Sequence, residues 1–241
     1  MKPAGGAALE IVGFDADDTL WHSETYFQDA QAGFEAILAR YVDITDARIH
    51  DRLLATEHAN IQLFGYGAKG MTLSMIETAI AVTDSRISAA DIHRIAEIGK
   101  DVLRHPVALL PGVREAVEAV AARHRIVLIT KGDLFHQERK VAESGLADLF
   151  HRIEIVSEKD EQSYARLLRE FDVPAQTFAM VGNSLKSDIA PVLALGGFGV
   201  HVPYHVTSRL EEIELDTAHP RLAVVTTASE IPRALENFSA R

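Results

Sequence analysis

Short apolar runs alternate with amphipathic segments along most of the chain. Five of the runs are almost continuously apolar, and a weaker sixth run lies near the C-terminus. Strands buried on both faces of a parallel sheet have this character, whereas half-exposed strands alternate apolar and polar positions. The pattern therefore predicts strands at residues 9–14, 125–130, 153–156, 177–181, 198–202 and 222–225.

The segments between these runs carry apolar residues with helical spacing. Val113, Ala116, Val117 and Val120 occupy positions i, i+3, i+4 and i+7, and the same spacing recurs over residues 164–171. Alternating strands and helices are typical of α/β proteins, in which right-handed crossovers place helices on both faces of the sheet. We therefore expect a doubly wound parallel sheet, a Rossmann-like core.

One region lacks the alternation. Residues 22–105 contain no convincing strand, and their apolar stripes predict about four helices. A helical insertion after the first strand lies where open α/β sheets bind ligands. We expect residues 1–21 and 106–241 to form the core domain and residues 22–105 to form an all-helical cap domain.

Composition and charge narrow the functional classes. The chain has 241 residues, of which 47% are hydrophobic and 24% charged, as in ordinary globular proteins. Its net charge of −11 disfavours nucleic acid and anionic membranes as partners. It has no cysteine, which excludes disulfides and thiolate chemistry. The N-terminal residues do not resemble a secretion signal, so a cytoplasmic location is the expectation.

Three acidic residues directly follow the first predicted strand. Asp15, Asp17 and Asp18 lie within four positions at the end of the run 9–14. Carboxylates at such close range repel one another, and each resists burial. A bound cation relieves this repulsion, and Mg²⁺ favours oxygen ligands from one or two carboxylates together with substrate phosphate. The cluster therefore indicates metal-assisted chemistry on a phosphorylated substrate.

Further polar groups follow the later strands. Thr130, Lys131 and Gly132 end the second predicted strand, Lys159 follows the third, and residues 182–188 follow the fourth. The carboxyl ends of parallel strands lie at one edge of the sheet. We therefore expect these groups to share a site with the acidic cluster.

In these motifs the chain resembles the haloacid dehalogenase-like (HAD) hydrolase superfamily. The order, spacing and strand context of four motifs agree over nearly the whole chain, and the helical insertion resembles the superfamily's C1 cap. The matching residues are Asp15, Asp17 and Thr19 in the first motif, Thr130 in the second, Lys159 in the third, and Gly182 and Asp188 in the fourth, where Asn183 replaces a frequent Asp.

The resemblance implies a role for each acidic residue. Asp15 would be the nucleophile that forms an aspartyl-phosphate, and Asp17 would be the general acid and then the general base. Mg²⁺ would be held by the Asp15 carboxylate, the Asp17 backbone carbonyl and Asp188. Asn183 could hold a metal-bound water through its amide oxygen, with one negative charge fewer than an Asp at this position.

The resemblance also implies how the phosphate is bound. Thr130 and the backbone N–H of Lys131 would bind phosphate oxygens, and Gly132 is a further candidate for substrate binding. Lys159 would offset the negative charge of nucleophile and phosphate. The Lys131 side chain could touch substrate or point into solvent, and Lys159 taken alone could be a surface residue. Residues 64–70 hold three glycines around Tyr66 and Lys69, which favours an ordered loop that selects substrate or a simple connection between helices.

Asp17 favours one reaction type over another. Dehalogenases of the superfamily lack an acid at this position, because a halide leaving group needs no proton. The sequence therefore predicts a Mg²⁺-dependent phosphatase acting on a small phosphorylated metabolite. The alternatives are a phosphotransferase or mutase of the same superfamily, a 2-haloacid dehalogenase and a non-catalytic binding protein. The substrate's identity and the oligomeric state are left open.

Overall fold

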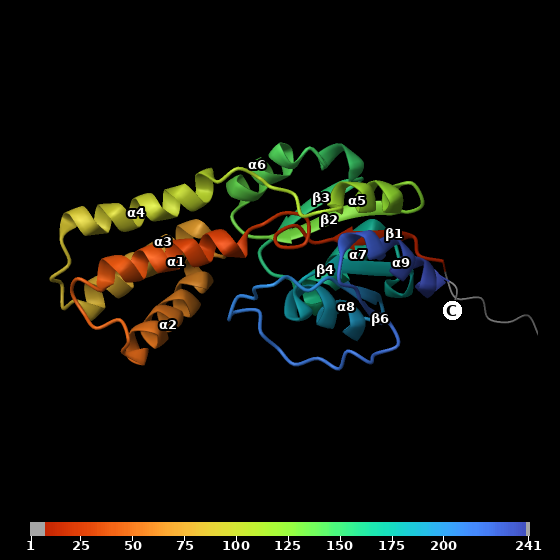
Figure 1. Ribbon diagram of the computed structural model, residues 1–241. Coiled ribbons are helices and arrows are strands. Elements are labelled where there is room, and N and C mark those ends of the chain that lie inside the picture. The colour runs from red at the N-terminus through yellow and green to blue at the C-terminus, as the bar shows by residue number, and fades with distance from the viewer. Residues whose placement is uncertain (1–7, 240–241) are drawn as a thin grey trace, which may run out of the picture. The chain divides into compact units, whose positions relative to one another are not determined.

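The computed structural model describes residues 8–239, which form two compact units (Figure 1). The first unit comprises Met1–Glu24, Val107–Lys131 and Glu138–Arg241, and the second comprises Thr25–Pro106 and Gly132–Gln137. Residues 132–137 thus belong to the helical unit, whereas the sequence pattern predicts them in the core domain. Residues 1–7, on which the expectation about a secretion signal rests, lie outside the described residues.

The first unit is built on one parallel six-stranded sheet, as the sequence predicts. The strand order is β3-β2-β1-β4-β5-β6, and every neighbouring pair is parallel. The direction of winding changes between β1 and β4, and a crevice at such a point is the usual ligand site of these sheets. The strands are β1 (Ile11–Phe14), β2 (Arg125–Lys131), β3 (Arg152–Val156), β4 (Phe178–Gly182), β5 (Phe198–His201) and β6 (Leu222–Val224).

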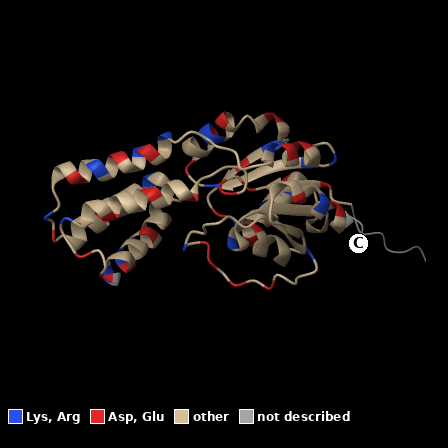
Figure 2. Cartoon of the chain, in the orientation of Figure 1, with Lys and Arg blue, Asp and Glu red and all other residues tan. Residues whose placement is uncertain are grey.

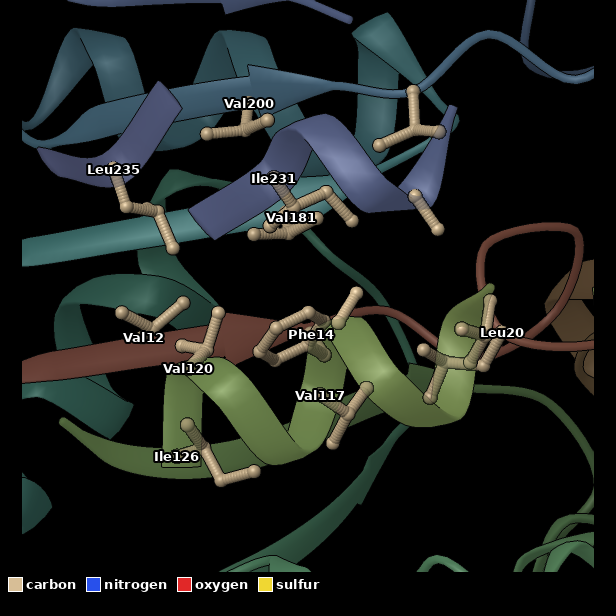
Figure 3. Packing of buried hydrophobic residues seen from close by; sticks show 14 of the residues in the cluster. Val12, Phe14, Leu20, Val117, Val120, Ile126, Val181, Val200, Ile231 and Leu235 are labelled. Atoms are coloured by element: carbon tan, nitrogen blue, oxygen red, sulfur yellow. The ribbon is translucent and has the colours of Figure 1, made fainter. Parts of the chain in front are cut away.

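Helices cover both faces of this sheet. On one face, Val12 and Phe14 of β1 pack against α5 (Val113–Ala121) and α9 (Ile231–Ser239), as Figure 3 shows. On the other face, Ile11 belongs to a cluster with residues of α7 (Glu161–Phe171) and with Val192 of α8 (Ala190–Ala194). Alternate residues of β1 therefore enter opposite cores, which explains the continuous apolar run in the sequence.

The second unit contains the helices inserted after β1. Its apolar core includes Phe34, Leu38, Met75 and Ile95, all of which are almost fully buried. Residues 25–106 contain helices and no strand, which agrees with the expected all-helical insertion. The helices are α1 (Glu24–Leu38), α2 (Ala47–Phe64), α3 (Ala68–Val82) and α4 (Ala89–Arg104).

Side-chain caps begin several helices. Ser88 and Asp160 accept hydrogen bonds from the backbone N–H groups of Asp91 and Ser163, at 3.1 and 2.7 Å. Such caps satisfy N–H groups that have no partner within the helix. The remaining helical segments are α6 (Leu134–Ser144), the short turns Ala147–Leu149, Ala175–Thr177 and Ala228–Glu230, and the π-helical turn Leu185–Ile189.

The expected seven-residue loop at 64–70 is wrong in its extent. Helix α2 continues to Phe64 and α3 begins at Ala68, so only three residues connect them. Gly65 and Gly67 have φ angles of 72° and 119°, which glycine adopts without strain. These two glycines make the sharp turn, and the third, Gly70, lies within α3 as does Lys69.

A long segment without strands or α-helices joins β5 to β6. Residues 202–221 are rich in acidic residues, which are coloured red along this stretch of chain in Figure 2. The segment nevertheless makes polar contacts with the first unit: the hydroxyl group of Tyr204 lies 2.6 Å from Nδ1 of His22, and Lys186 donates to the Leu210 carbonyl at 2.6 Å. None of the helices in residues 8–239 is both long and apolar enough to cross a membrane.

Candidate active site

Asp15 follows β1 directly and lies in a buried, fully contacted position. Its backbone N–H donates to the Val181 carbonyl of β4 at 2.9 Å, so the residue continues the sheet's hydrogen bonding. The Thr19 hydroxyl donates to Oδ2 of Asp15 at 2.9 Å, and Nζ of Lys159 contacts Oδ1. Contacts to both oxygens hold the carboxylate in one orientation, which a nucleophile requires.

Lys159 lies between two carboxylates and is buried. Its Nζ donates to Oδ1 of Asp188 at 2.7 Å as well as to Asp15. The residue is only 4% exposed, so the interpretation of Lys159 as a surface lysine is wrong. Burial opposes its charge, but the carboxylates of Asp15 and Asp188 outweigh that effect and raise the pKa of Lys159 above its usual value. The two carboxylates therefore favour the charged ammonium form of Lys159 in this site.

Asp188 reaches the site because Gly182 has no side chain. A Cβ atom at Gly182 would lie 2.2 Å from Oδ2 of Asp188, far inside van der Waals contact. The same oxygen accepts the backbone N–H of Ser184 at 2.9 Å. The glycine at the end of β4 and the turn after it thus place the Asp188 carboxylate next to Lys159.

The charges around Asp15 change its acidity. Burial, followed by repulsion from Asp188, raises the pKa of Asp15 from 3.8 to about 7, although Lys159 opposes both effects. Neutral Asp15 would be a poor nucleophile. A cation bound to its carboxylate would stabilise the ionised form and remove this obstacle.

The amide of Asn183 fits its surroundings with its nitrogen turned toward Asp15. In that orientation the nitrogen donates to Thr19 Oγ1 at 3.1 Å, to Asp15 Oδ2 at 3.2 Å and to the Asp17 carbonyl oxygen at 3.1 Å. The Thr19 hydroxyl already gives its proton to Asp15, so it can accept this bond and one from the Asn183 backbone N–H. Oδ2 of Asp15 and the backbone carbonyl oxygen of Asp17 thus both face the Asn183 amide nitrogen.

These oxygens fit a hard cation such as Mg²⁺. Asp15 Oδ2 and the Asp17 carbonyl oxygen converge on the Asn183 amide, and Asp188 shares Lys159 with Asp15. Within residues 8–239, no group of three or more His, Asp or Glu side chains is arranged to hold a metal ion. The candidate oxygen donors are the Asp15 and Asp188 carboxylates and the Asp17 backbone carbonyl, which are ligands of the type that Mg²⁺ prefers. Asn183 would join them only with its amide oxygen turned toward Asp15.

Asp17 is held by two donors that no sequence motif indicates. Nζ of Lys140 lies 2.6 and 2.7 Å from the two carboxylate oxygens of Asp17, and Nε1 of Trp21 donates to Oδ1 at 2.7 Å. The Lys140 side chain is 8% exposed and that of Asp17 is 28% exposed. The Asp17 carboxyl group is thus fixed by its neighbours while part of its surface stays accessible.

Asp18 stabilises the loop after β1 through hydrogen bonds to nearby backbone N–H groups. Its carboxylate accepts the N–H groups of Ser23 and Glu24 at 2.8 and 3.0 Å. Its φ angle of 61° places it in the left-handed region, where Asp is tolerated better than most side chains. Burial and the nearby Asp17 raise the pKa of Asp18 to about 8. Asp18 therefore turns the chain after the first motif.

Lys131 is bound within the protein, so the interpretation of a solvent-facing side chain is wrong. Its Nζ donates to Glu211 at 2.6 Å and to Ser187 Oγ at 2.9 Å, and it lies 3.4 Å from Glu158. Burial would raise the pKa of Glu211, but Lys131 and the hydroxyls of Ser184 and Ser187 outweigh it and lower that pKa. The acidic segment after β5 is thereby anchored beside the end of β2.

The other residues expected to bind substrate are divided between the two units. Thr130 is buried at the end of β2, one residue before Lys131. Gly132 has a φ angle of 138° and belongs to the second unit, as do Tyr66 and Lys69. Lys69 pairs with Asp133 of the same unit at 2.9 Å. Contact of Thr130, Gly132, Tyr66 and Lys69 with substrate stays a prediction.

Sequence motifs did not reveal Lys140 or Glu211. Helix α6 has an unusual buried stripe at positions 137, 140, 141 and 144, because only Val141 in it is apolar. A lysine in register with a buried valine needs a charged partner, and this is the signal that could have identified Lys140. Glu211 lies in a segment without periodicity, and its sequence context gives no comparable signal.

Comparisons with known proteins identify the family of the chain. Residues 9–196 match the family model described as haloacid dehalogenase-like hydrolase. A haloacid dehalogenase-like family hydrolase from Xanthomonas campestris is 56% identical, with 97% of each chain covered and a TM-score of 0.88. No similar sequence was found among curated proteins.

More distant solved structures share the fold. A 2-haloacid dehalogenase from Pseudomonas syringae pv. Tomato DC3000 is 19% identical, with 95% and 99% of the two chains covered and a TM-score of 0.62. The HAD-hydrolase YfnB from Bacillus subtilis, solved with bound magnesium, is 14% identical, with 95% and 99% covered and a TM-score of 0.65. The match to the family model and the 56% identity to the Xanthomonas campestris protein are evidence of sequence relationship as well as of a shared fold. The chain therefore belongs to the haloacid dehalogenase-like hydrolases.

Proposed function

We propose that this hydrolase is a Mg²⁺-dependent phosphatase that removes phosphate from a small phosphomonoester through an aspartyl-phosphate. The observation that carries the proposal is the carboxyl group of Asp17, held two residues after Asp15 by Lys140 and Trp21. An ester oxygen needs a proton as it leaves, whereas a halide does not. A carboxyl group fixed at this position favours an oxygen leaving group, although a dehalogenase shares the fold.

Asp15 is the proposed nucleophile. Its carboxylate attacks phosphorus, a new O–P bond forms, and the bond between phosphorus and the ester oxygen breaks. Thr19 and Lys159 hold its two oxygens, so little reorientation is needed before attack. The Lys159 ammonium offsets negative charge on both Asp15 and the phosphoryl group, an effect that is strengthened by its burial.

Asp17 is the proposed proton donor and acceptor. The departing alkoxide takes a proton from the Asp17 carboxyl group and leaves as an alcohol. A water molecule then attacks phosphorus, gives a proton back to Asp17 and releases inorganic phosphate, which restores the Asp15 carboxylate. Each proton taken from Asp17 in the first step is therefore returned in the second.

The remaining polar atoms of the site would bind either Mg²⁺ or the phosphate group. The carboxylates of Asp15 and Asp188 with the Asp17 carbonyl oxygen would hold the ion, and Asn183 would contact its bound water. When bound, Mg²⁺ neutralises phosphate charge and favours ionised Asp15. The magnesium-bound YfnB structure and the oxygen donor set support this choice of metal. The Thr130 hydroxyl and the Lys131 backbone N–H are the proposed phosphate donors.

A panel of phosphorylated metabolites tests the proposal. The wild-type protein is assayed for inorganic phosphate with Mg²⁺ and with a chelator, alongside Asp15→Asn. We expect release of phosphate from at least one monoester with Mg²⁺, none with chelator, and none from the variant. Release of halide from a 2-haloacid by a protein that hydrolyses no phosphate ester would overturn the proposal, and so would equal activity of Asp15→Asn.

A further inference from the structure

Two buried lysines each contact one aspartate of the first motif. Lys159 contacts Asp15, whereas Lys140 contacts Asp17, and the two lysines are 4% and 6% exposed. Burying an ammonium group is unfavourable unless it meets a partner of opposite charge. Lys159 matches a motif of the superfamily, but Lys140 matches none, so its burial beside Asp17 needs its own explanation.

The contact between Lys140 and Asp17 constrains the whole carboxyl group. Nζ of Lys140 lies within hydrogen-bond distance of both oxygens, at 2.6 and 2.7 Å. The indole N–H of Trp21 donates to one of them at 2.7 Å, and Trp21 is itself 1% exposed. A carboxyl group contacted at both oxygens by buried donors cannot rotate without breaking these bonds.

We propose that Lys140 is a positioning residue that, together with Trp21, fixes the Asp17 carboxyl group for proton transfer to the leaving oxygen. The inference rests on the proposed phosphatase function and adds a residue to it. Proton transfer requires the carboxyl oxygen to lie within hydrogen-bond reach of the leaving oxygen, so its rate depends on orientation. Loss of Lys140 should therefore matter most when the leaving group needs a proton.

Two aryl phosphates of similar shape provide the test. Phenyl phosphate releases a phenolate that benefits from protonation, whereas p-nitrophenyl phosphate releases a much better leaving group. The quantity to compare is kcat/KM, because it reports steps up to the release of the first product. For Lys140→Met we expect kcat/KM to fall about tenfold or more with phenyl phosphate and by a clearly smaller factor with p-nitrophenyl phosphate.

Matched variants separate positioning from general damage. Asp17→Asn should show the same dependence on the leaving group, and Lys140→Arg should restore much of the lost activity with phenyl phosphate. Lys100→Met removes an exposed lysine of the second unit and should leave kcat/KM unchanged with both substrates. Circular dichroism and thermal melting check the fold, and Lys140→Gln replaces Lys140→Met if that variant does not fold.

The outcomes distinguish this inference from the proposed function. If the wild-type protein hydrolyses both esters and a folded Lys140 variant loses the same factor with each, the positioning role is contradicted and the phosphatase function stands. Failure of both Lys140→Met and Lys140→Gln to fold would also overturn the positioning role, because it would assign Lys140 to the structure. If the wild-type protein hydrolyses no phosphate ester, both the function and the inference fail.

Discussion

The ammonium group of Lys159 lies 2.7 Å from Oδ1 of Asp188, and the two side chains are only 2% and 1% exposed. Asp15 contacts the same ammonium group, so one buried cation serves two buried carboxylates. This arrangement leaves one negative charge in excess when both carboxylates are ionised. A further positive charge would balance this excess, and several measurable properties depend on it.

Replacing Lys159 by methionine tests this charge balance. Removing one partner of a buried ion pair should lower the free energy of unfolding by about 3 kcal/mol in the absence of metal, because both carboxylates lose their counter-charge. Mg²⁺ should recover part of the loss by binding the folded state. Urea unfolding with Mg²⁺ and with chelator measures both effects, with the exposed Lys100→Met as control. An unchanged stability would contradict the arrangement.

The raised pKa of Asp15 predicts how the metal-free protein responds to pH. Between its ordinary value of 3.8 and its folded value of about 7, the folded state keeps a proton that the unfolded state releases. Stability should therefore fall as pH rises through this window and then level off. Asp18 contributes in the same direction, since its pKa is raised to about 8.

The variant Asp15→Asn isolates the contribution of Asp15. Urea unfolding of both proteins in chelator, at a series of pH values across the window, gives the difference in their free energies of unfolding. We expect the wild-type protein to lose stability relative to the variant as pH rises. A relative gain with rising pH would show that the folded state favours ionised Asp15 even without a metal.

Asn183→Asp should shift the balance between metal binding and metal-free stability. The amide nitrogen that contacts Asp15 and the Asp17 carbonyl is replaced by an oxygen, and a further carboxylate enters the site. Without metal, stability should fall by about 1 kcal/mol because a hydrogen bond is replaced by repulsion. Mg²⁺ affinity should rise about tenfold, since ligand charge strengthens binding. Calorimetric titration measures the affinity, and weaker binding would contradict the assigned position.

Gly182→Ala should displace Asp188. The new Cβ atom would lie 2.2 Å from Oδ2 of Asp188, so the carboxylate or the strand end must move. We expect a loss of about 2 kcal/mol in stability and weaker binding of Mg²⁺. Gly33→Ala is the matched control, because its Cβ atom meets only the end of the flexible Ile98 side chain at 3.1 Å. Thermal melting and Mg²⁺ titration of the two variants should therefore differ, and equal behaviour would argue against the crowding.

The sequence predicts the sheet well because burial on both faces leaves a strong signal. The six runs from Leu9 to Val225 agree with β1 to β6 to within two residues at either end. Local signals are weaker where tertiary contacts decide the outcome. The glycines of residues 64–70 predicted a loop, yet α3 begins at Ala68, because its packing outweighs the low helix propensity of Gly70.

The candidate site was predictable only where each residue follows a strand. Asp15, Lys159 and Asp188 lie far apart in sequence, and the parallel sheet brings them together. Lys140 and Glu211 reach the site from a helix and from an irregular segment, so their positions depend on three-dimensional packing. Sequence order therefore indicated the candidate carboxylates but not the side chains that hold them.

The most direct test is detection of the aspartyl-phosphate. Asp17→Asn is mixed rapidly with Mg²⁺ and p-nitrophenyl phosphate that carries the radiolabel on phosphorus. The p-nitrophenolate can leave without a proton donor, whereas hydrolysis of the aspartyl-phosphate needs the general base that this variant lacks. After an acid quench we expect label on Asp15, identified by peptide mass spectrometry. We expect no label on the double variant that carries both Asp15→Asn and Asp17→Asn. Phosphate release without label on Asp15, or labelling that survives Asp15→Asn, would contradict the account.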